Sequence, residues 1–230
     1  MSKAFGDVFK QLIKDNKLFF FLSLLFLLIA GGILLFIKQG DAIFFFSNRR
    51  STFGDLFFTY GTRLGEEVVY LVVLLILLMV RFRYAIIIPI LGFSVSVISY
   101  LTKTYFGHDR PSLYFRKLGM LDEINLVEGI VLNGGTTSFP SGHTMSAFAL
   151  YAFFAFCLPH KKWLAALLFL IALVVGISRI YLVQHFLQDV YLGAILGLLV
   201  GMSWYWVQSR FSDRPDHWVN RKIRKRHKGA

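Results

Sequence analysis

His185 and Asp189 are the residues whose types and spacing most directly suggest chemistry, since they stand four positions apart. On a helix this spacing puts both side chains on one face, so the carboxylate can bind one ring nitrogen of the histidine. That contact fixes the tautomer and leaves the other ring nitrogen basic, as a nucleophile requires. A hydrogen bond that only supports the fold is the other interpretation of the pair.

The run Pro140-Ser141-Gly142-His143 opens an apolar segment and indicates a second functional group. Proline suits the first turn of a helix. The amides of Ser141, Gly142 and His143 would then be free donors at the positive end of the helix dipole, which is a natural phosphate site. Glycine leaves room for an anion to approach. An ordinary helix start with a hydrogen-bonded histidine remains the alternative interpretation.

Lys103, Arg110 and Arg179 supply three cations near the ends of apolar segments. Taken singly, Lys103 is explained as an interfacial anchor and Arg110 as a solvated loop charge. Together with the two histidines and Asp189, however, they map to one membrane face from three separate regions. Ionisable residues placed this way in a membrane protein usually serve function. Three cations also match the charge that develops on phosphoryl oxygens in a transition state.

Six apolar segments must position these groups. The chain has 230 residues, of which 56% are hydrophobic and 17% charged, with a mean hydropathy of +0.61. Too little polar sequence remains to cover a soluble domain. We therefore predict an all-α integral membrane protein, a bundle of six transmembrane helices over residues 18–37, 68–80, 84–102, 141–159, 163–178 and 190–208. The second segment is too short to cross the membrane by itself, so residues from 56–65 must contribute to the span.

The predicted organisation is one membrane domain over residues 1–230, with an N-terminal segment 1–17, a six-helix core 18–208 and a basic tail 209–230. The glycines Gly193, Gly197 and Gly201 recur every four residues and predict a close helix–helix contact. The single cysteine, Cys157, excludes an internal disulfide.

Lysine and arginine counts predict the orientation. Sixteen of the 25 such residues fall on the side that carries both termini. The positive-inside rule then puts both termini in the cytoplasm of a bacterial inner membrane and the active site at the periplasmic interface. Much of the net charge of +12 lies in residues 209–230. We expect this tail to contact anionic lipid headgroups and not nucleic acid.

The three groups resemble the signatures of the type 2 phosphatidic acid phosphatase superfamily: a lysine followed later by Arg-Pro, then Pro-Ser-Gly-His, then Ser-Arg with a histidine and an aspartate behind it. All three occur in order between Lys103 and Asp189. The resemblance implies phosphate-ester hydrolysis through a phosphohistidine, with no metal or cofactor. The roles it implies are attack on phosphorus by His185, orientation by Asp189, protonation of the leaving oxygen by His143, and binding of the phosphoryl oxygens by Lys103, Arg110, Ser141, Gly142 and Arg179.

A site at the membrane interface suggests a lipid phosphate, since the acyl or prenyl chain can stay in the bilayer. A prenyl pyrophosphate, such as undecaprenyl pyrophosphate, or phosphatidylglycerol phosphate is the first choice. Phosphatidic acid and lipid A phosphate present similar chemistry, and the motifs do not separate them. The sequence leaves the oligomeric state open.

Two other functions deserve comparison. A zinc hydrolase would use His143, His185, Asp189 and His108 as ligands, although no short metal-binding spacing is present. A small anion transporter would line its path with Arg110 and Arg179, and predicts charges near the bilayer midplane. Four further polar residues lie on this face. Solvation at a helix end explains Glu66 and Glu67, and solvation of a loop explains His108 and Asp109.

Overall fold

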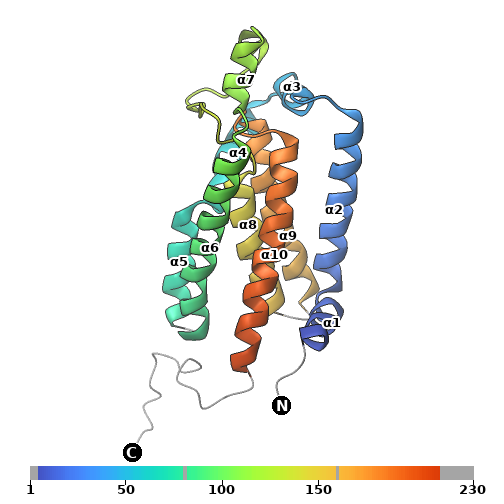
Figure 1. The fold of residues 1–230 in the computed structure, drawn as a ribbon, viewed down its shortest axis with the longest axis vertical. Coiled ribbons are helices and arrows are strands. Elements are labelled where there is room, and N and C mark those ends of the chain that lie inside the picture. The colour runs from blue at the N-terminus through green and yellow to red at the C-terminus, as the bar shows by residue number, and fades with distance from the viewer. Residues whose placement is uncertain (1–4, 80–81, 159–160, 213–230) are drawn as a thin grey trace, which may run out of the picture.

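The computed structural model of this chain describes residues 5–79, 82–158 and 161–212, and every regular element within them is a helix (Figure 1). The α-helices are α1 (Phe5–Asp15), α2 (Lys17–Phe36), α3 (Asp41–Ser47), α4 (Thr52–Gly61), α5 (Glu67–Leu78), α6 (Phe82–Phe106), α7 (Pro111–Lys117), α8 (Gly142–Cys157), α9 (Lys162–Tyr181) and α10 (Leu187–Ser212). Two short 3-10 helices, η1 (Thr62–Gly65) and η2 (Leu121–Glu123), join them.

Each predicted span overlaps an apolar helix. Among the described residues, four stretches are long and apolar enough to cross a membrane: Lys17–Phe36, Phe82–Lys117, Lys162–Tyr181 and Leu187–Arg210. Helices α5 and α8 are apolar but have only 12 and 16 residues. The described part of the chain is thus all-helical with four candidate spans, and the count of six stays a prediction.

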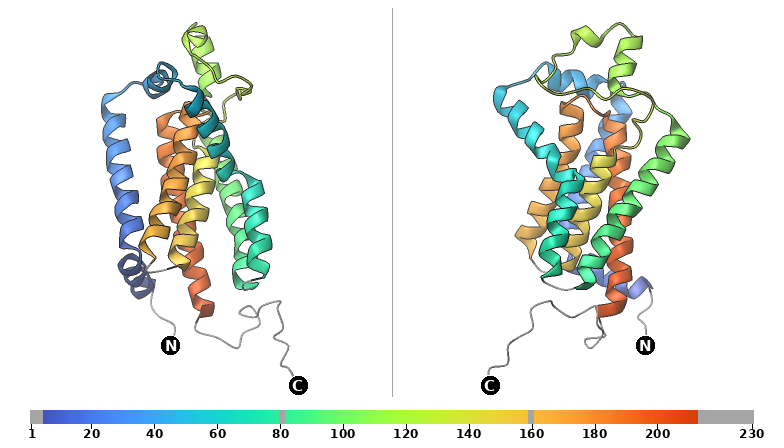
Figure 2. Two further views of the ribbon diagram at one scale, coloured as in Figure 1. Left: turned by 180° about the vertical axis from the view of Figure 1, so that it is seen from behind. Right: turned by 90° about the vertical axis from the view of Figure 1, so that its left-hand side faces the viewer.

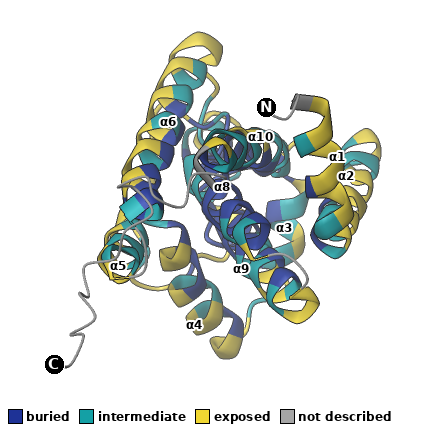
Figure 3. Cartoon of the chain, turned by 90° about the horizontal axis from the view of Figure 1, so that it is seen from below, coloured by how far each residue is buried: buried dark blue, intermediate teal, exposed yellow. Residues whose placement is uncertain are grey.

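Helix α8 is the centre of the bundle. Eleven of its 16 residues are buried, and it packs against α6, α9 and α10. Viewed along the bundle, α8 lies among these helices and its surface is buried, whereas α2, α4 and α6 expose wide faces (Figure 3). A helix surrounded by protein does not need the length that contact with lipid demands, which explains why α8 is short.

The predicted glycine stripe is the contact surface between α10 and α8. A Cβ atom added at Gly193 would lie 2.7 Å from the carbonyl oxygen of Ser141, and one at Gly197 would lie 2.5 Å from that of Met145. Gly201 approaches the carbonyl oxygen of Ala149 in the same way, at 2.8 Å. Only glycine allows backbones to approach this closely. The prediction of a close helix–helix contact is confirmed.

The predicted second span is divided into α4, η1 and α5, which follow one another along the bundle (Figure 2). The chain is extended at Glu66, with φ −86° and ψ 164°, and this residue precedes α5. Just before it, Gly65 lies against α8, because a Cβ there would be 3.0 Å from the carbonyl oxygen of His143. The break therefore brings the start of α5 to the start of α8.

The bundle has two distinct ends. Helix α1 and the last turns of α10 lie at one end, while α3, α7 and the loop after α7 lie at the other (Figures 1 and 2). The predicted contact with lipid headgroups involves the basic tail 209–230, of which residues 213–230 lie outside the described residues. Residues 1–4 lie outside them as well. The side of the membrane on which each end lies stays a prediction.

The glycine contact can be tested by Gly197→Ala, with Gly32→Ala in α2 as the control. The added methyl group at Gly197 meets a backbone carbonyl, so we expect a loss of about 1–3 kcal/mol of stability. A Cβ at Gly32 meets nothing within 4 Å. Alanine there should be neutral or stabilising, because it is the better helix former. Thermal unfolding in detergent measures both, and equal midpoints for the two variants would contradict the contact.

Candidate active site

His185 lies in the turn between α9 and α10, and its ring contacts Asp189 in the first turn of α10. Its Nδ1 is 3.2 Å from Asp189 Oδ2, and both side chains are buried. The predicted contact is confirmed, but His185 precedes the helix and is not part of it. The turn is fixed by the carbonyl oxygen of Arg179, which accepts from the amides of Gln184 at 2.9 Å and His185 at 3.0 Å.

The Asp189 carboxylate is held by more than His185. Its Oδ2 also accepts from the amide of Phe186 at 3.0 Å, which caps the start of α10, and from the hydroxyl of Ser138. The sequence reasoning missed Ser138. This residue lies in an irregular segment before Phe139, where no helical spacing links it to Asp189. Its hydroxyl and its place next to the Pro140 group were the only signals available.

This arrangement sets the state of the His185 ring. With Nδ1 donating to Asp189, the lone pair of Nε2 remains available. Burial lowers the pKa of His185 to about 4, while the hydrogen bond and charge of Asp189 oppose that shift. Charged rings are penalised in a desolvated site, so His185 is neutral at pH 7. A neutral, oriented imidazole is suited to nucleophilic attack.

Ser141 is the N-cap of α8, and its Oγ accepts from the Thr144 amide at 3.4 Å and from the Thr144 hydroxyl at 2.9 Å. The amide of Ser141 donates to the carbonyl oxygen of Asp189 at 2.9 Å. The prediction that this amide is a free donor is therefore wrong: it joins α8 to α10. The amides of Gly142 and His143 are the first-turn donors that remain, since neither has a carbonyl one turn earlier in the helix.

Gly142 creates room beside Lys103. A Cβ at Gly142 would lie 3.1 Å from Ser99 Oγ and 3.6 Å from Lys103 Nζ. The ammonium group of Lys103 thus approaches the start of α8, where the helix dipole already favours an anion. The close packing of Ser99 favours glycine at this position, and α6 supplies the cation beside it, while the approach of an anion to Gly142 stays a prediction.

The two arginines reach the site from different elements. Arg179, near the end of α9, is buried, and its Nη1 donates to Thr62 Oγ1 at 2.8 Å, a contact the sequence reasoning missed. Its Nε has no hydrogen-bond partner within the described residues. Arg110, at the start of α7, donates weakly to the carbonyl oxygen of Gln184 and to Thr137 Oγ1, at 3.4 Å each.

These groups form one cluster. Lys103, Arg110, Arg179 and the His185 ring all lie within electrostatic range of His143. The fold therefore brings three regions of the sequence to one end of the bundle. The most distant residues among them, Lys103 and Asp189, are 86 positions apart. We refer to Lys103, Arg110 and Arg179 as the cationic cluster.

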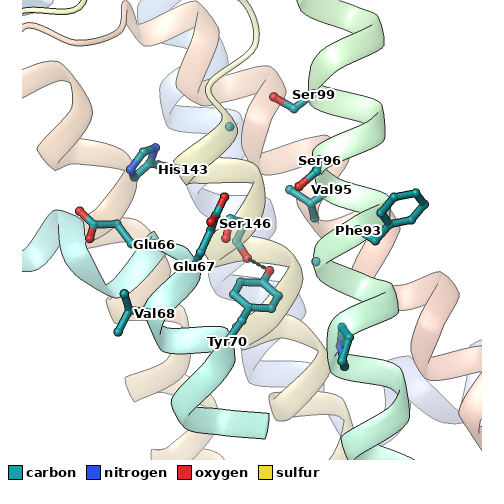
Figure 4. Close-up of a pocket in the computed structure, with 14 residues that line it drawn as sticks. Glu66, Glu67, Val68, Tyr70, Phe93, Val95, Ser96, Ser99, His143 and Ser146 are labelled. Carbon is teal, nitrogen blue, oxygen red and sulfur yellow. Dashed lines mark hydrogen bonds between the residues drawn. The ribbon is translucent and has the colours of Figure 1, made fainter.

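A cavity of about 640 Å³ opens from His143 between α5, α6 and α8 (Figure 4). Glu66 and Glu67 line it next to His143. The rest of the lining is mixed: apolar residues such as Val68 and Phe93 stand beside the hydroxyl-bearing residues Tyr70, Ser96, Ser99 and Ser146. Val68 is 65% exposed and Phe93 is 70% exposed, so the cavity reaches the outer, apolar surface of the bundle. Its size is that of ordinary ligand sites in proteins.

Residues 68–213 match the family model of the PAP2 superfamily. The chain belongs to the PAP2 superfamily. Its relatives include phosphatidylglycerophosphatase B of Bacillus subtilis, which is 45% identical over 71 residues, or 27% of this chain and 35% of the relative. Lipid A 1-phosphatase of Porphyromonas gingivalis is 29% identical over 151 residues, or 59% of this chain and 34% of the relative. The chain spans about a third of the length of these two curated relatives.

A solved structure has the same fold. The crystal structure of Aquifex aeolicus LpxE superposes with a TM-score of 0.61 and 28% identity, covering 74% of this chain and 95% of that one. The bundle is thus the PAP2 fold, and the residues with sequence-predicted roles lie together at one end of it.

The other sequence hypotheses receive no geometric support in this PAP2 chain. Within the described ranges, no group of three or more His, Cys, Asp or Glu side chains is placed to hold a metal ion. His108 packs against the rings of Phe106 and Phe139, at 5.9 Å and 5.0 Å between centroids. The charges that a transporter would need at mid-bundle lie instead at helix ends.

The environment of His185 predicts its titration. Because burial lowers its pKa to about 4, the ring should gain a proton only near that pH, well below the ordinary value of about 6.5. Asp189→Asn removes the charge that favours the protonated ring and should lower the pKa further. Nitrogen-15 NMR of histidine-labelled protein measures both, with His185→Gln assigning the signal. Titration of His185 near 6.5 would contradict the buried geometry.

Proposed function

We propose that this protein is a membrane lipid phosphatase that works through a phosphohistidine at His185. The observation that carries the proposal is the buried contact between His185 and Asp189 beside the cationic cluster. Such a site combines an oriented nucleophile with positive charge where phosphoryl oxygens would lie. Membership of the PAP2 superfamily and the names of its relatives support the same activity.

In the first step, the lone pair of His185 Nε2 attacks phosphorus. A P–N bond forms while the P–O bond to the lipid alcohol breaks. The protonated His143 ring, whose positive charge the bound phosphate offsets, gives its proton to the leaving oxygen and becomes neutral. Asp189 stabilises the positive charge that the His185 ring acquires. Lys103, Arg110, Arg179, the Ser141 hydroxyl and the amides of Gly142 and His143 hold the phosphoryl oxygens, which is most of what phosphoryl transfer requires.

In the second step, His143 takes a proton from water, and the resulting nucleophile attacks phosphorus. The P–N bond breaks, inorganic phosphate leaves and His185 returns to its neutral state. Each proton that leaves a group in one step returns to it in the other, so the cycle closes without a metal or cofactor.

The cavity beside His143 supports a lipid substrate, because its apolar lining reaches the outer surface of the bundle. A leaving alcohol could enter it while the attached chain stays in the bilayer. The substrates considered are undecaprenyl pyrophosphate or another prenyl pyrophosphate, phosphatidylglycerol phosphate, phosphatidic acid and lipid A phosphate. We place the enzyme in a bacterial inner membrane with both termini cytoplasmic and the site facing the periplasm, as the positive-inside rule favours.

Phosphate release by the purified full chain in detergent, with excess chelator, tests the activity on these four lipids. We expect turnover that persists in chelator and falls by about 10³-fold or more in His185→Ala, because the nucleophile is lost. His108→Gln is the matched control, since this histidine lies outside the site. Phosphate-labelled lipid should leave acid-labile label on wild type and none on His185→Ala. Chelator-sensitive turnover would instead favour a metal-dependent hydrolase.

Ser138 should act as a positioning residue. Ser138→Ala removes a donor to the Asp189 carboxylate, and a hydrogen bond to a charged group contributes about 1.5–3 kcal/mol. We expect kcat to fall about tenfold or more with little change in KM, because Ser138 supports Asp189 and not the lipid. Ser138→Thr restores the hydroxyl and should restore much of kcat. A change confined to KM would refute this role.

A further inference from the structure

Gln184, the residue before His185, is buried and commits both ends of its amide group to one loop. Its Nε2 donates to the carbonyl oxygen of Val131 at 3.0 Å, and its Oε1 accepts from Asn133 Nδ2 at 2.6 Å. Both partners lie in the irregular segment that follows η2 and leads to α8. One side chain in the turn between α9 and α10 therefore holds a loop that is 51 positions away in the sequence.

The loop continues as a short exposed stretch, residues 133–137, which we call the strap. All five of its residues are exposed, and two of them are glycines, of which Gly135 has a φ of +87°. The residues on either side, Leu132 and Ser138, are partly and fully buried. Because the strap itself buries little apolar surface, hydrogen bonds rather than packing decide where it lies.

Arg110 of the cationic cluster is bonded to this strap. Its amide donates to the carbonyl oxygen of Gly135 at 2.9 Å, and its Nε donates to Thr137 Oγ1 at 3.4 Å. Its Nη1 reaches the carbonyl oxygen of Gln184, also at 3.4 Å, and the arginine lies within electrostatic range of His185. The two guanidinium contacts are long and therefore weak, so the position of Arg110 depends on the position of the strap.

Asn133 joins the Gln184 side of the loop to the helix that follows Arg110. Its side chain donates to Gln184, while its carbonyl oxygen accepts from the hydroxyl of Ser112 at 2.8 Å. Ser112 is buried in the first turn of α7, two residues after Arg110. A continuous chain of hydrogen bonds thus runs from the turn that carries His185, through Asn133, to the start of α7.

We infer that Gln184 is a positioning residue of the proposed reaction: it fixes the strap, and the strap fixes Arg110 beside His185. This inference rests on the proposed function. A primary amide suits the position because it offers a donor to Val131 and an acceptor to Asn133 at the same time. A guanidinium set in place beforehand needs no reorganisation when charge develops on the phosphoryl oxygens, so its misplacement should lower kcat more than it changes KM.

Gln184→Met tests the inference in the purified full chain, because methionine keeps the side-chain length and removes both amide functions. The matched control is Gln188→Met, since Gln188 is in the first turn of α10 but lines a separate small cavity with Lys38 and Gly40. On whichever of the four lipids wild type turns over fastest, we expect Gln184→Met to lower kcat about tenfold and to change KM by less than about threefold. The control should behave as wild type.

The same substitution in an Arg110→Ala background separates positioning from a general loss of structure. If Gln184 acts through Arg110, Gln184→Met should lower kcat there by less than about twofold. Hydrogen–deuterium exchange in detergent needs no turnover: peptides that contain the amide of Arg110 should exchange faster in Gln184→Met, while those of α8 should not change.

Three results would overturn the role of Gln184 and leave the phosphatase activity in place. They are wild-type kcat in Gln184→Met, a tenfold loss that persists in the Arg110→Ala background, and unchanged exchange at Arg110. The absence of wild-type turnover on every lipid would overturn the proposed function, and this inference with it.

Discussion

The close approach of α10 to α8 is the constraint on which the site depends. Lipid offers no hydrophobic drive for two apolar helices to associate, so van der Waals contact between small residues must supply it. Gly193 and Gly197 let the two backbones touch. At the end of this contact the amide of Ser141 reaches the carbonyl of Asp189. The start of α8 and the turn that carries His185 are thereby fixed to one another, as a two-part site requires.

Buried polar groups near this contact are stabilised by partners from distant segments. Thr62 binds the Arg179 guanidinium and Ser138 binds Asp189, while the carbonyl oxygen of Arg179 itself holds the nearby His185 turn. Without such partners, burying these groups would cost more than the fold could offset. The same bonds prevent reorientation of the side chains, so their dipoles and charges are set before a substrate arrives.

Residue types and order along the chain were enough to predict the helical architecture, the glycine contact and the His185–Asp189 pair. The pair forms although His185 lies outside the helix. The carbonyl oxygen of Arg179 accepts hydrogen bonds from the amides of Gln184 and His185 and so holds the turn before the start of α10. Ser138 and Thr62 were not predictable, because each is far from its partner in the sequence and no local spacing of residues links the two. The break before α5 likewise depends on Gly65 packing against α8, which α5 alone does not encode.

The charges around His143 bear on its acid role. The cationic cluster lies within electrostatic range of His143, Glu66 and Glu67 line the cavity beside it, and Glu66 also lies within electrostatic range of Arg179. In the proposed reaction an alkoxide forming beside these two carboxylates is disfavoured, so departure requires a proton at the leaving oxygen as the bond breaks. The carboxylates therefore make protonation by His143 decisive for release of the lipid alcohol.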